Sequence, residues 1–241
     1  MKLVNTSKGR CGFCNELFEF RAMEKHLESC KRRKSEEGSA LSAPSRHKRS
    51  KHSPKEETNI LSLGVRGEAY PSTYWMYLET PSGAKLRDLD NFLRDTWVEC
   101  CDHLSQFTID GFRYVSMPTG QVGDRSMTMP LGSALRRGLD FMYEYDFGTT
   151  TELALKVLSV RRGMWNNREH VRIMARNVPP VIPCASCGEA AATNVCTECI
   201  LEEDIKNAWF CDGCSKKHEC EEEMLSPVVN SPRVGMCGYT G

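Results

Sequence analysis

The feature that most constrains this chain is a run of three CxxC pairs near its C-terminus. The pairs lie within 31 residues, and a histidine and a further cysteine follow them. Paired thiols at this spacing form the tight knuckles that hold a tetrahedral Zn²⁺, and small modules of this kind use metal in place of a hydrophobic core. Four donors per ion leave no open coordination position, so we expect two structural zinc sites. The eight donors are Cys184, Cys187, Cys196, Cys199, Cys211, Cys214, His218 and Cys220.

The spacing of these donors resembles that of B-box and MYND-like cross-braces, in which the first and third pairs share one metal and the second and fourth share the other. The resemblance implies one site made of Cys184, Cys187, Cys211 and Cys214, and a second made of Cys196, Cys199, His218 and one more cysteine. Two cysteines compete for that last position. Cys220 is two residues from His218, whereas Cys237 would close a loop of 18 residues back onto the metal. We expect Cys220 to be the ligand and Cys237 to lie near the site as a free thiol.

A third zinc site is expected at the other end of the chain. Its donors are Cys11, Cys14, His26 and Cys30. The spacing resembles a C2H2 finger whose last histidine is replaced by cysteine and which is shortened by one residue. Phe18 and Met23 stand where a small ββα finger places its two core residues. The whole chain is therefore predicted to bind three zinc ions.

Two changes in composition divide the chain. Residues 31–59 hold nine Lys or Arg, four Glu and six Ser, which cannot bury enough apolar surface to order the segment. Three prolines within residues 179–183 mark a second boundary. The predicted parts are a C2HC finger (1–30), a disordered basic linker (31–59), a middle domain (60–178) and a cysteine-rich two-zinc module (184–241).

The middle domain is predicted to be α+β, with a mostly antiparallel sheet and one long amphipathic helix. Apolar residues recur every three or four positions from Leu86 to Leu104, which predicts a helix of about five turns. Asp110 and Gly111 separate two apolar runs and indicate a type I′ hairpin. Further strands are expected at 74–79, 151–160 and 171–175.

Alternation between residues 139 and 147 predicts a half-buried strand. Its buried side is expected to carry Phe141, Tyr143, Tyr145 and Phe147. Its solvent side is expected to carry Asp140, Met142, Glu144 and Asp146.

Two motifs of the middle domain resemble a known family. They are DHLSQFTIDG at residues 102–111, which follows the predicted helix, and YDFG at residues 145–148. Both are similar to the Ri-plasmid ORF-three-like proteins, also called insertion-element passenger or TnpR-like, over about 110 residues of this chain. The finger and the ending NSPRVGMCGYTG look like appendages of zinc-bearing members. The resemblance implies a mobile-element context, for which no biochemical function is established.

Departures from the family pattern fall at polar positions. Members often continue YDFG with an acidic residue, a tryptophan and a histidine, where this chain has Thr149, Thr150 and Thr151 followed by Glu152 and Leu153. Ser105 also stands where a second histidine is common near His103. Any chemistry that this polar set performs in the family is therefore expected to be lost here.

The zero net charge of the chain hides two regions of opposite sign. Residues 1–59 carry 14 basic against 8 acidic residues, and residues 184–226 carry ten Asp or Glu against three Lys. We expect weak, salt-sensitive contact with nucleic acid through residues 1–59, above all through Lys31–Lys34 and Arg46–Lys51. The alternative is a solvated linker or a localisation signal. The acidic tail would repel phosphate, so it is expected to contact protein or only to brace the fold.

These features together predict a non-enzymatic, zinc-binding adaptor. The alternative is an enzyme of mobile-element or nucleic-acid metabolism that uses His103 and Asp146, with Asp140 and Glu144 as weaker candidates. The sequence contains none of the motifs GxxxxGK, GxSxG, HExxH and GxGxxG, which excludes the common nucleotide-binding and hydrolase signatures. Cys100 and Cys101 are expected to be one buried and one peripheral thiol.

The cellular location is also predicted from what the sequence lacks. The first ten residues are polar, and no apolar run reaches the roughly 18 residues of a membrane-spanning helix. We therefore expect neither a secretory signal nor a membrane contact, and a reducing compartment: the cytoplasm, or the nucleus if the source is eukaryotic. The oligomeric state stays open.

Overall fold

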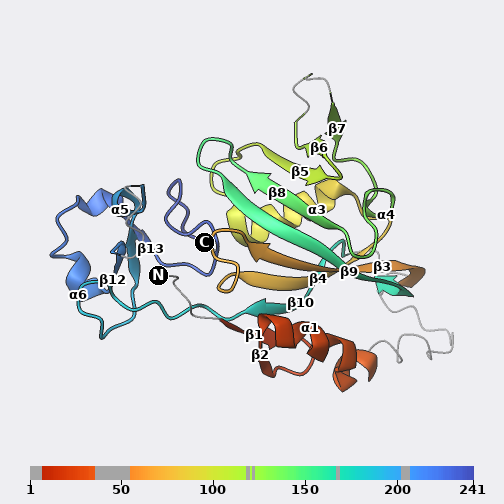
Figure 1. The fold of residues 1–241 in the computed structure, drawn as a ribbon, viewed down its shortest axis with the longest axis horizontal. Helices are drawn as coiled ribbons and strands as arrows, with labels where there is room; N and C mark the ends of the chain where they lie inside the picture. Colours follow the sequence, from red (N-terminus) through yellow and green to blue (C-terminus); the bar gives the residue numbers. More distant parts are fainter. Residues whose placement is uncertain (1–6, 36–54, 118–119, 121–122, 167–168, 202–206) are drawn as a thin grey trace, which may run out of the picture.

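The computed structural model of the chain describes residues 7–35, 55–117, 120, 123–166, 169–201 and 207–241. It has one large, mostly antiparallel sheet with few helices, and a small three-stranded sheet lies at one end of the molecule (Figure 1). The α+β fold class predicted from the sequence is thereby confirmed. Among the described residues no helix is both long and apolar enough to cross a membrane.

The large sheet has ten strands, and all neighbours are antiparallel except the last pair, β6 and β7. In spatial order the strands are β2 (Leu17–Glu19), β1 (Lys8–Cys11), β10 (Arg172–Asn177), β4 (Trp75–Pro81), β3 (Lys55–Gly67), β9 (Thr151–Asn166), β8 (Asp140–Tyr145), β5 (Ser105–Ile109), β6 (Phe112–Val115) and β7 (Asp124–Ser126). The small sheet has the order β12 (Trp209–Phe210), β11 (Asn194–Cys196) and β13 (Leu225–Pro227). The helices are α1 (Phe20–Ser29), α3 (Leu86–Leu93), η1 (Arg94–Val98), α4 (Leu131–Ala134), α5 (Thr197–Leu201), α6 (Asp212–Ser215) and η2 (Glu222–Met224).

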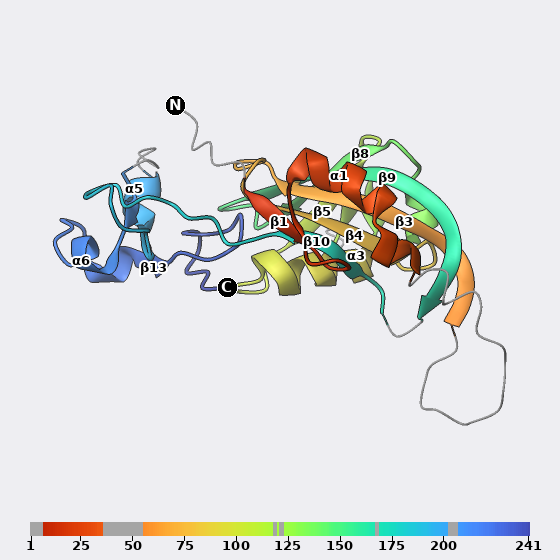
Figure 2. The ribbon, with the colours of Figure 1, turned by 90° about the horizontal axis from the view of Figure 1, so that it is seen from below.

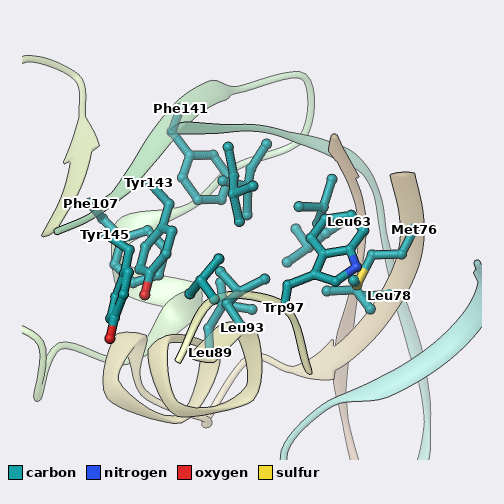
Figure 3. Packing of buried hydrophobic residues seen from close by; sticks show 14 of the residues in the cluster. Leu63, Met76, Leu78, Leu89, Leu93, Trp97, Phe107, Phe141, Tyr143 and Tyr145 are labelled. Carbon is teal, nitrogen blue, oxygen red and sulfur yellow. The ribbon is translucent and has the colours of Figure 1, made fainter. Parts of the chain in front are cut away.

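Strand β4 is buried on both faces and separates two clusters of apolar side chains. Met76 and Leu78 point toward α3, whereas Trp75 and Tyr77 point toward α1, as the period of two in a strand requires. Figure 2 shows the two helices on opposite sides of the sheet. The larger cluster, between α3 and the sheet, forms the main core (Figure 3).

The predicted five-turn helix is wrong in its length. The helical segment runs from Leu86 to Val98, its last five residues have π-helical geometry, and Glu99 has extended backbone angles. Leu104, which the apolar period placed in the core, is 38% exposed. The chain turns away after Val98 because Arg94 pairs with Glu99 at 2.7 Å and also donates to the His103 carbonyl at 2.5 Å.

Strand β3 was not expected, and it overlaps the predicted linker. It begins at Lys55 and pairs with β9 along its whole length, so residues 55–59 belong to the sheet. Composition favoured a linker because these residues are polar, but backbone pairing with a long neighbouring strand holds them in place. Residues 36–54 of the predicted linker lie outside the described residues.

The expected hairpin is confirmed. Ile109 of β5 pairs with Phe112 of β6, and Asp110 and Gly111 between them have φ values of +50° and +79°. Positive φ at both central positions defines a type I′ turn, which Asp-Gly adopts at little cost. A two-residue signal was sufficient because the turn depends only on local backbone geometry.

The end of β8 differs from the predicted alternation. The strand stops at Tyr145, and Asp146 takes a φ of +64°. Asp146 is therefore buried instead of facing solvent, and Phe147 is 51% exposed instead of buried. The buried charge of Arg233, 2.8 Å from Asp146, explains why the carboxylate turns inward.

Residues 228–241 form a C-terminal arm that leaves the tail module and returns to the large sheet (Figure 1). Ser231 donates a hydrogen bond of 2.5 Å to the Trp97 carbonyl. Pro232 lies against Gly67, where a Cβ would be only 2.6 Å from the proline ring. The arm also keeps contact with the tail module, since the Val228 N–H donates to the Thr193 carbonyl at 2.9 Å and Gly235 lies against Ile200 and Val195.

Candidate metal centres

All thirteen cysteines of the chain fall into four groups of four donors. One group has four cysteines, and each of the other three has three cysteines and one histidine. Within each group the donor atoms lie within 4.8 Å of one another. Ligands of one tetrahedral Zn²⁺ bound through sulfur are about 3.8 Å apart, so all four groups have dimensions suited to a metal ion. The groups are Cys11, Cys14, His26 and Cys30; Cys184, Cys187, Cys211 and Cys214; Cys196, Cys199, His218 and Cys220; and Cys100, Cys101, His103 and Cys237.

The N-terminal group combines a knuckle with one helical turn. The knuckle follows β1, where Asn15 adopts a φ of +68° and donates from its backbone to the Cys11 carbonyl. His26 lies on α1 one turn before Cys30, and its Nε2 is 3.2 Å from the sulfur of Cys14. The ring of Phe18 stacks on His26 with centroids 4.1 Å apart, which fixes the imidazole toward the thiols.

The finger hairpin is part of the large sheet. Strand β1 pairs with β10, so the finger hairpin extends the sheet at one edge. Phe20, the first residue of α1, stacks on Tyr77, and the Tyr77 hydroxyl donates a 2.8 Å hydrogen bond to the Phe20 carbonyl. Met23 is fully buried in the same cluster. A segment this small has too little core of its own, and the sheet supplies the missing apolar contacts.

The first tail group is built from two knuckles, of which Cys184 and Cys187 precede β11, and Cys211 and Cys214 directly follow β12. Cys184 is buried, and burial by itself raises the pKa of its thiol. Backbone N–H groups of Cys187, Cys211 and Ser186 outweigh this effect and lower the pKa to about 6. A lowered pKa favours the thiolate, which is the form of cysteine that binds metal.

The second tail group contains Cys220 and not Cys237. The sulfur of Cys199 lies 3.4 Å from Nε2 of His218 and 3.9 Å from the sulfur of Cys220. The ring of Phe210 packs on His218 at 4.2 Å. The donors of the two tail groups alternate along the chain in the order that the cross-brace resemblance implies.

The fourth group was not anticipated as a set. Nε2 of His103 is 3.3 Å from the sulfur of Cys237, and Nδ1 faces Asp146 at 3.6 Å. The expectation that Cys237 would lie near the tail group is wrong, because the arm carries it to the middle domain. The number of cysteines in the sequence could have indicated this group. The finger and the tail use ten of the thirteen, which leaves Cys100, Cys101 and Cys237.

Of the enzyme candidates, only His103 and Asp146 lie together. Asp140 is exposed and pairs with Lys156 at 3.1 Å, and Glu144 accepts a 2.5 Å hydrogen bond from Gln106. Burial raises the pKa of Asp146, but the hydrogen bond from Arg233 and two backbone N–H groups lower it more. Asp146 is thus an ionised carboxylate held by an arginine, which makes it a poor proton donor.

The predicted phosphate-contacting residues are divided by the structure. Lys31, Arg32 and Lys34 are exposed, but Arg33 is largely buried and pairs with Glu79 at 2.7 Å. The second basic stretch, Arg46–Lys51, lies outside the described residues.

No protein-family model and no curated protein matches the sequence. One solved structure similar to this chain is that of a protein of unknown function from Methanosarcina mazei Go1. The two share 15% sequence identity with a TM-score of 0.42, over 49% of this chain and 69% of the other.

Proposed function

We propose that the protein is a non-enzymatic adaptor whose binding surfaces are held in place by zinc. The observation that carries the proposal is the completeness of the three groups in the finger and the tail. A zinc ion with four protein ligands has no open position for water or substrate, so such sites contribute folding energy and not catalysis. Each group also joins two separate chain segments, which is the task of a structural ion.

The protein-binding surface in this proposal is the tail module. Its described part exposes seven carboxylates and two lysines, and Leu201 beside them is 75% exposed. A surface that combines negative charge with exposed apolar side chains suits a basic, partly apolar segment of a partner protein. The exposed carboxylates are Glu189, Glu198, Asp212, Glu219, Glu221, Glu222 and Glu223.

Affinity capture with the full chain tests this surface. The test variant carries Glu221→Lys, Glu222→Lys and Glu223→Lys, and the matched control carries Glu68→Lys, Glu152→Lys and Glu169→Lys, which are exposed carboxylates of the large sheet and its loops. Proteins retained by the wild type and the control but lost from the tail variant would support the proposal. Identical captured sets for all three chains would refute it. A nuclease-treated sample separates partners that are bridged by nucleic acid.

We propose in addition that the finger contacts nucleic acid weakly through phosphate. Residues 7–35 expose seven basic side chains against three glutamates. The positions that read bases in C2H2 helices, −1, 3 and 6, are here Glu19, Ala22 and Lys25. An acidic and a small residue at two of them disfavour base readout, so the proposed contact has no sequence preference. The exposed basic residues are Lys8, Arg10, Arg21, Lys25, Lys31, Arg32 and Lys34.

The enzyme alternative is less well supported. His103 and Asp146 are neighbours, as that alternative requires, but each already has another partner. Nε2 of His103 faces Cys237 at 3.3 Å, and Asp146 pairs with Arg233 at 2.8 Å. A general base needs a free ring nitrogen beside its substrate, and here that nitrogen points into a cluster of thiols.

A further inference from the structure

We propose that Cys100, Cys101, His103 and Cys237 bind a fourth zinc ion, which fastens the C-terminal arm to the middle domain. This inference does not depend on the adaptor function. It concerns a contact between two parts of the same chain that lie 134 residues apart in sequence at His103 and Cys237.

The donor set selects the metal. Three thiols and one imidazole lie within 4.8 Å of one another, and His103 Nε2 is 3.3 Å from Cys237 Sγ. Thiolate and imidazole ligands favour Zn²⁺ over Mg²⁺ and Ca²⁺, which prefer oxygen. The set matches the Cys₃His composition common in structural zinc sites.

The loop that carries three of the donors is held in position by a hydrogen-bonded network. The Tyr145 hydroxyl accepts from the backbone N–H groups of Cys100 at 3.4 Å and His103 at 3.2 Å. It donates in turn to Glu99 at 2.8 Å, and Glu99 also accepts from the Asp102 backbone at 2.6 Å. A loop fixed in this way presents its side chains without an ordering cost at the moment of binding.

The orientation of His103 is that of a metal ligand. Its Nε2 faces the thiols, and its Nδ1 faces a carboxylate oxygen of Asp146 at 3.6 Å. Metal-bound histidines usually place their second ring nitrogen against a carboxylate or carbonyl, which fixes the ring and its tautomer. Asp146 is itself held by Arg233 at 2.8 Å and by the Gly148 N–H at 3.0 Å.

The arm delivers the fourth donor. Arg233 is fully buried and anchors the arm through Asp146, Thr151 and the Thr149 carbonyl. Its guanidinium also lies 3.3 Å from the sulfur of Cys100. Cys237, four residues later, takes a φ of +48° and turns toward His103. The proposed ion thus fastens the arm at exposed Cys237, beyond the part of the arm that Arg233 anchors.

Native mass spectrometry of the full chain under reducing conditions tests the proposal. The expected count is four zinc ions in the wild type, and three in Cys237→Ser and in Cys101→Ser. Cys101 is exposed and lies outside the arm, so Cys101→Ser removes one donor without altering the arm's own sequence. A wild type that holds three ions, or variants that hold as many as the wild type, would overturn the site.

Hydrogen exchange identifies which ion each variant has lost. The matched control is Cys220→Ser, which should also hold three ions but through loss of a tail site. Faster exchange in the arm is expected for Cys237→Ser and not for Cys220→Ser, whose faster exchange should fall in the small sheet. The double variant with Cys237→Ser and Cys220→Ser should hold two ions. An arm with wild-type exchange in Cys237→Ser would overturn the fastening role.

Discussion

The guanidinium of Arg33, three residues beyond the last donor of the finger, lies 2.7 Å from the carboxylate of Glu79 in the middle of the large sheet. Glu79 is fully buried and also pairs with Arg161 at 2.8 Å and with Arg172. One carboxylate thus collects three positive charges from three chain segments. The finger and the sheet are joined by this charge as well as by the apolar contacts of Phe20 and Met23.

Replacing Glu79 is expected to cost about 3–5 kcal/mol in the free energy of unfolding, because Glu79→Gln removes the charge of a fully buried carboxylate that pairs with three arginines. The matched control is Glu57→Gln, since Glu57 pairs with exposed Arg162 at 3.2 Å. That pair should contribute about 0–1 kcal/mol. Urea denaturation at neutral pH, with zinc in the buffer, measures both. Similar losses of unfolding free energy in Glu79→Gln and Glu57→Gln would show that the three ion pairs of Glu79 contribute no more than an exposed pair.

The same carboxylate predicts a pH dependence. Burial raises the pKa of Glu79, but Arg33, Arg161 and Arg172 lower it more, so its folded pKa lies below the usual value. A group with a depressed folded pKa contributes stability above its unfolded pKa, about 4.3 for glutamate, and loses it as the pH falls through the folded pKa. The wild type should therefore lose stability below about pH 4.3 more steeply than Glu79→Gln. Loss of metal in acid affects both chains, so the difference between them isolates Glu79; parallel curves would contradict the prediction.

Binding of nucleic acid should separate Arg33 from its neighbours. Exposed Lys31, Arg32 and Lys34 are free to meet phosphate, so their joint replacement by Gln should weaken binding and reduce the slope of log affinity against log salt, by up to about 0.9 per lost phosphate contact. Arg33→Gln should instead lower stability with little change in affinity. Fluorescence anisotropy with a labelled duplex at several salt concentrations measures this. Absent binding at low salt, or equal affinity for the triple variant and the wild type, would leave the basic stretch as a solvated segment.

The parts of the structure that were predicted correctly depend on short spacings. The Asp110-Gly111 turn needs only the backbone preferences of two residues. A CxxC knuckle likewise forms from four consecutive residues, and the helical spacing of His26 and Cys30 places both on one face of α1. Such signals are readable because no distant segment is needed to complete them.

The parts that were missed depend on distant segments. The apolar period beyond Val98 continues through Cys100 and Leu104, but Arg94, Glu99 and Tyr145 together stop the helix. Likewise Cys237 meets His103 only because Arg233 anchors the arm near Asp146. Spacing along the chain carries no record of such contacts, and only the three cysteines left over from the finger and tail pointed to a further group.

The early end of the helix gives a last prediction. Leu89 lies on α3 and is fully buried in the main core, so Leu89→Ala should lower the free energy of unfolding by about 2–5 kcal/mol. Leu104 occupies an equivalent position in the apolar period but is 38% exposed, so Leu104→Ala should change stability by no more than about 0.5 kcal/mol. Urea midpoints compared at equal m-value, with zinc present throughout, decide between these values. If Leu104→Ala costs as much as Leu89→Ala, the amphipathic helix continues beyond Val98 and Leu104 belongs to the core after all.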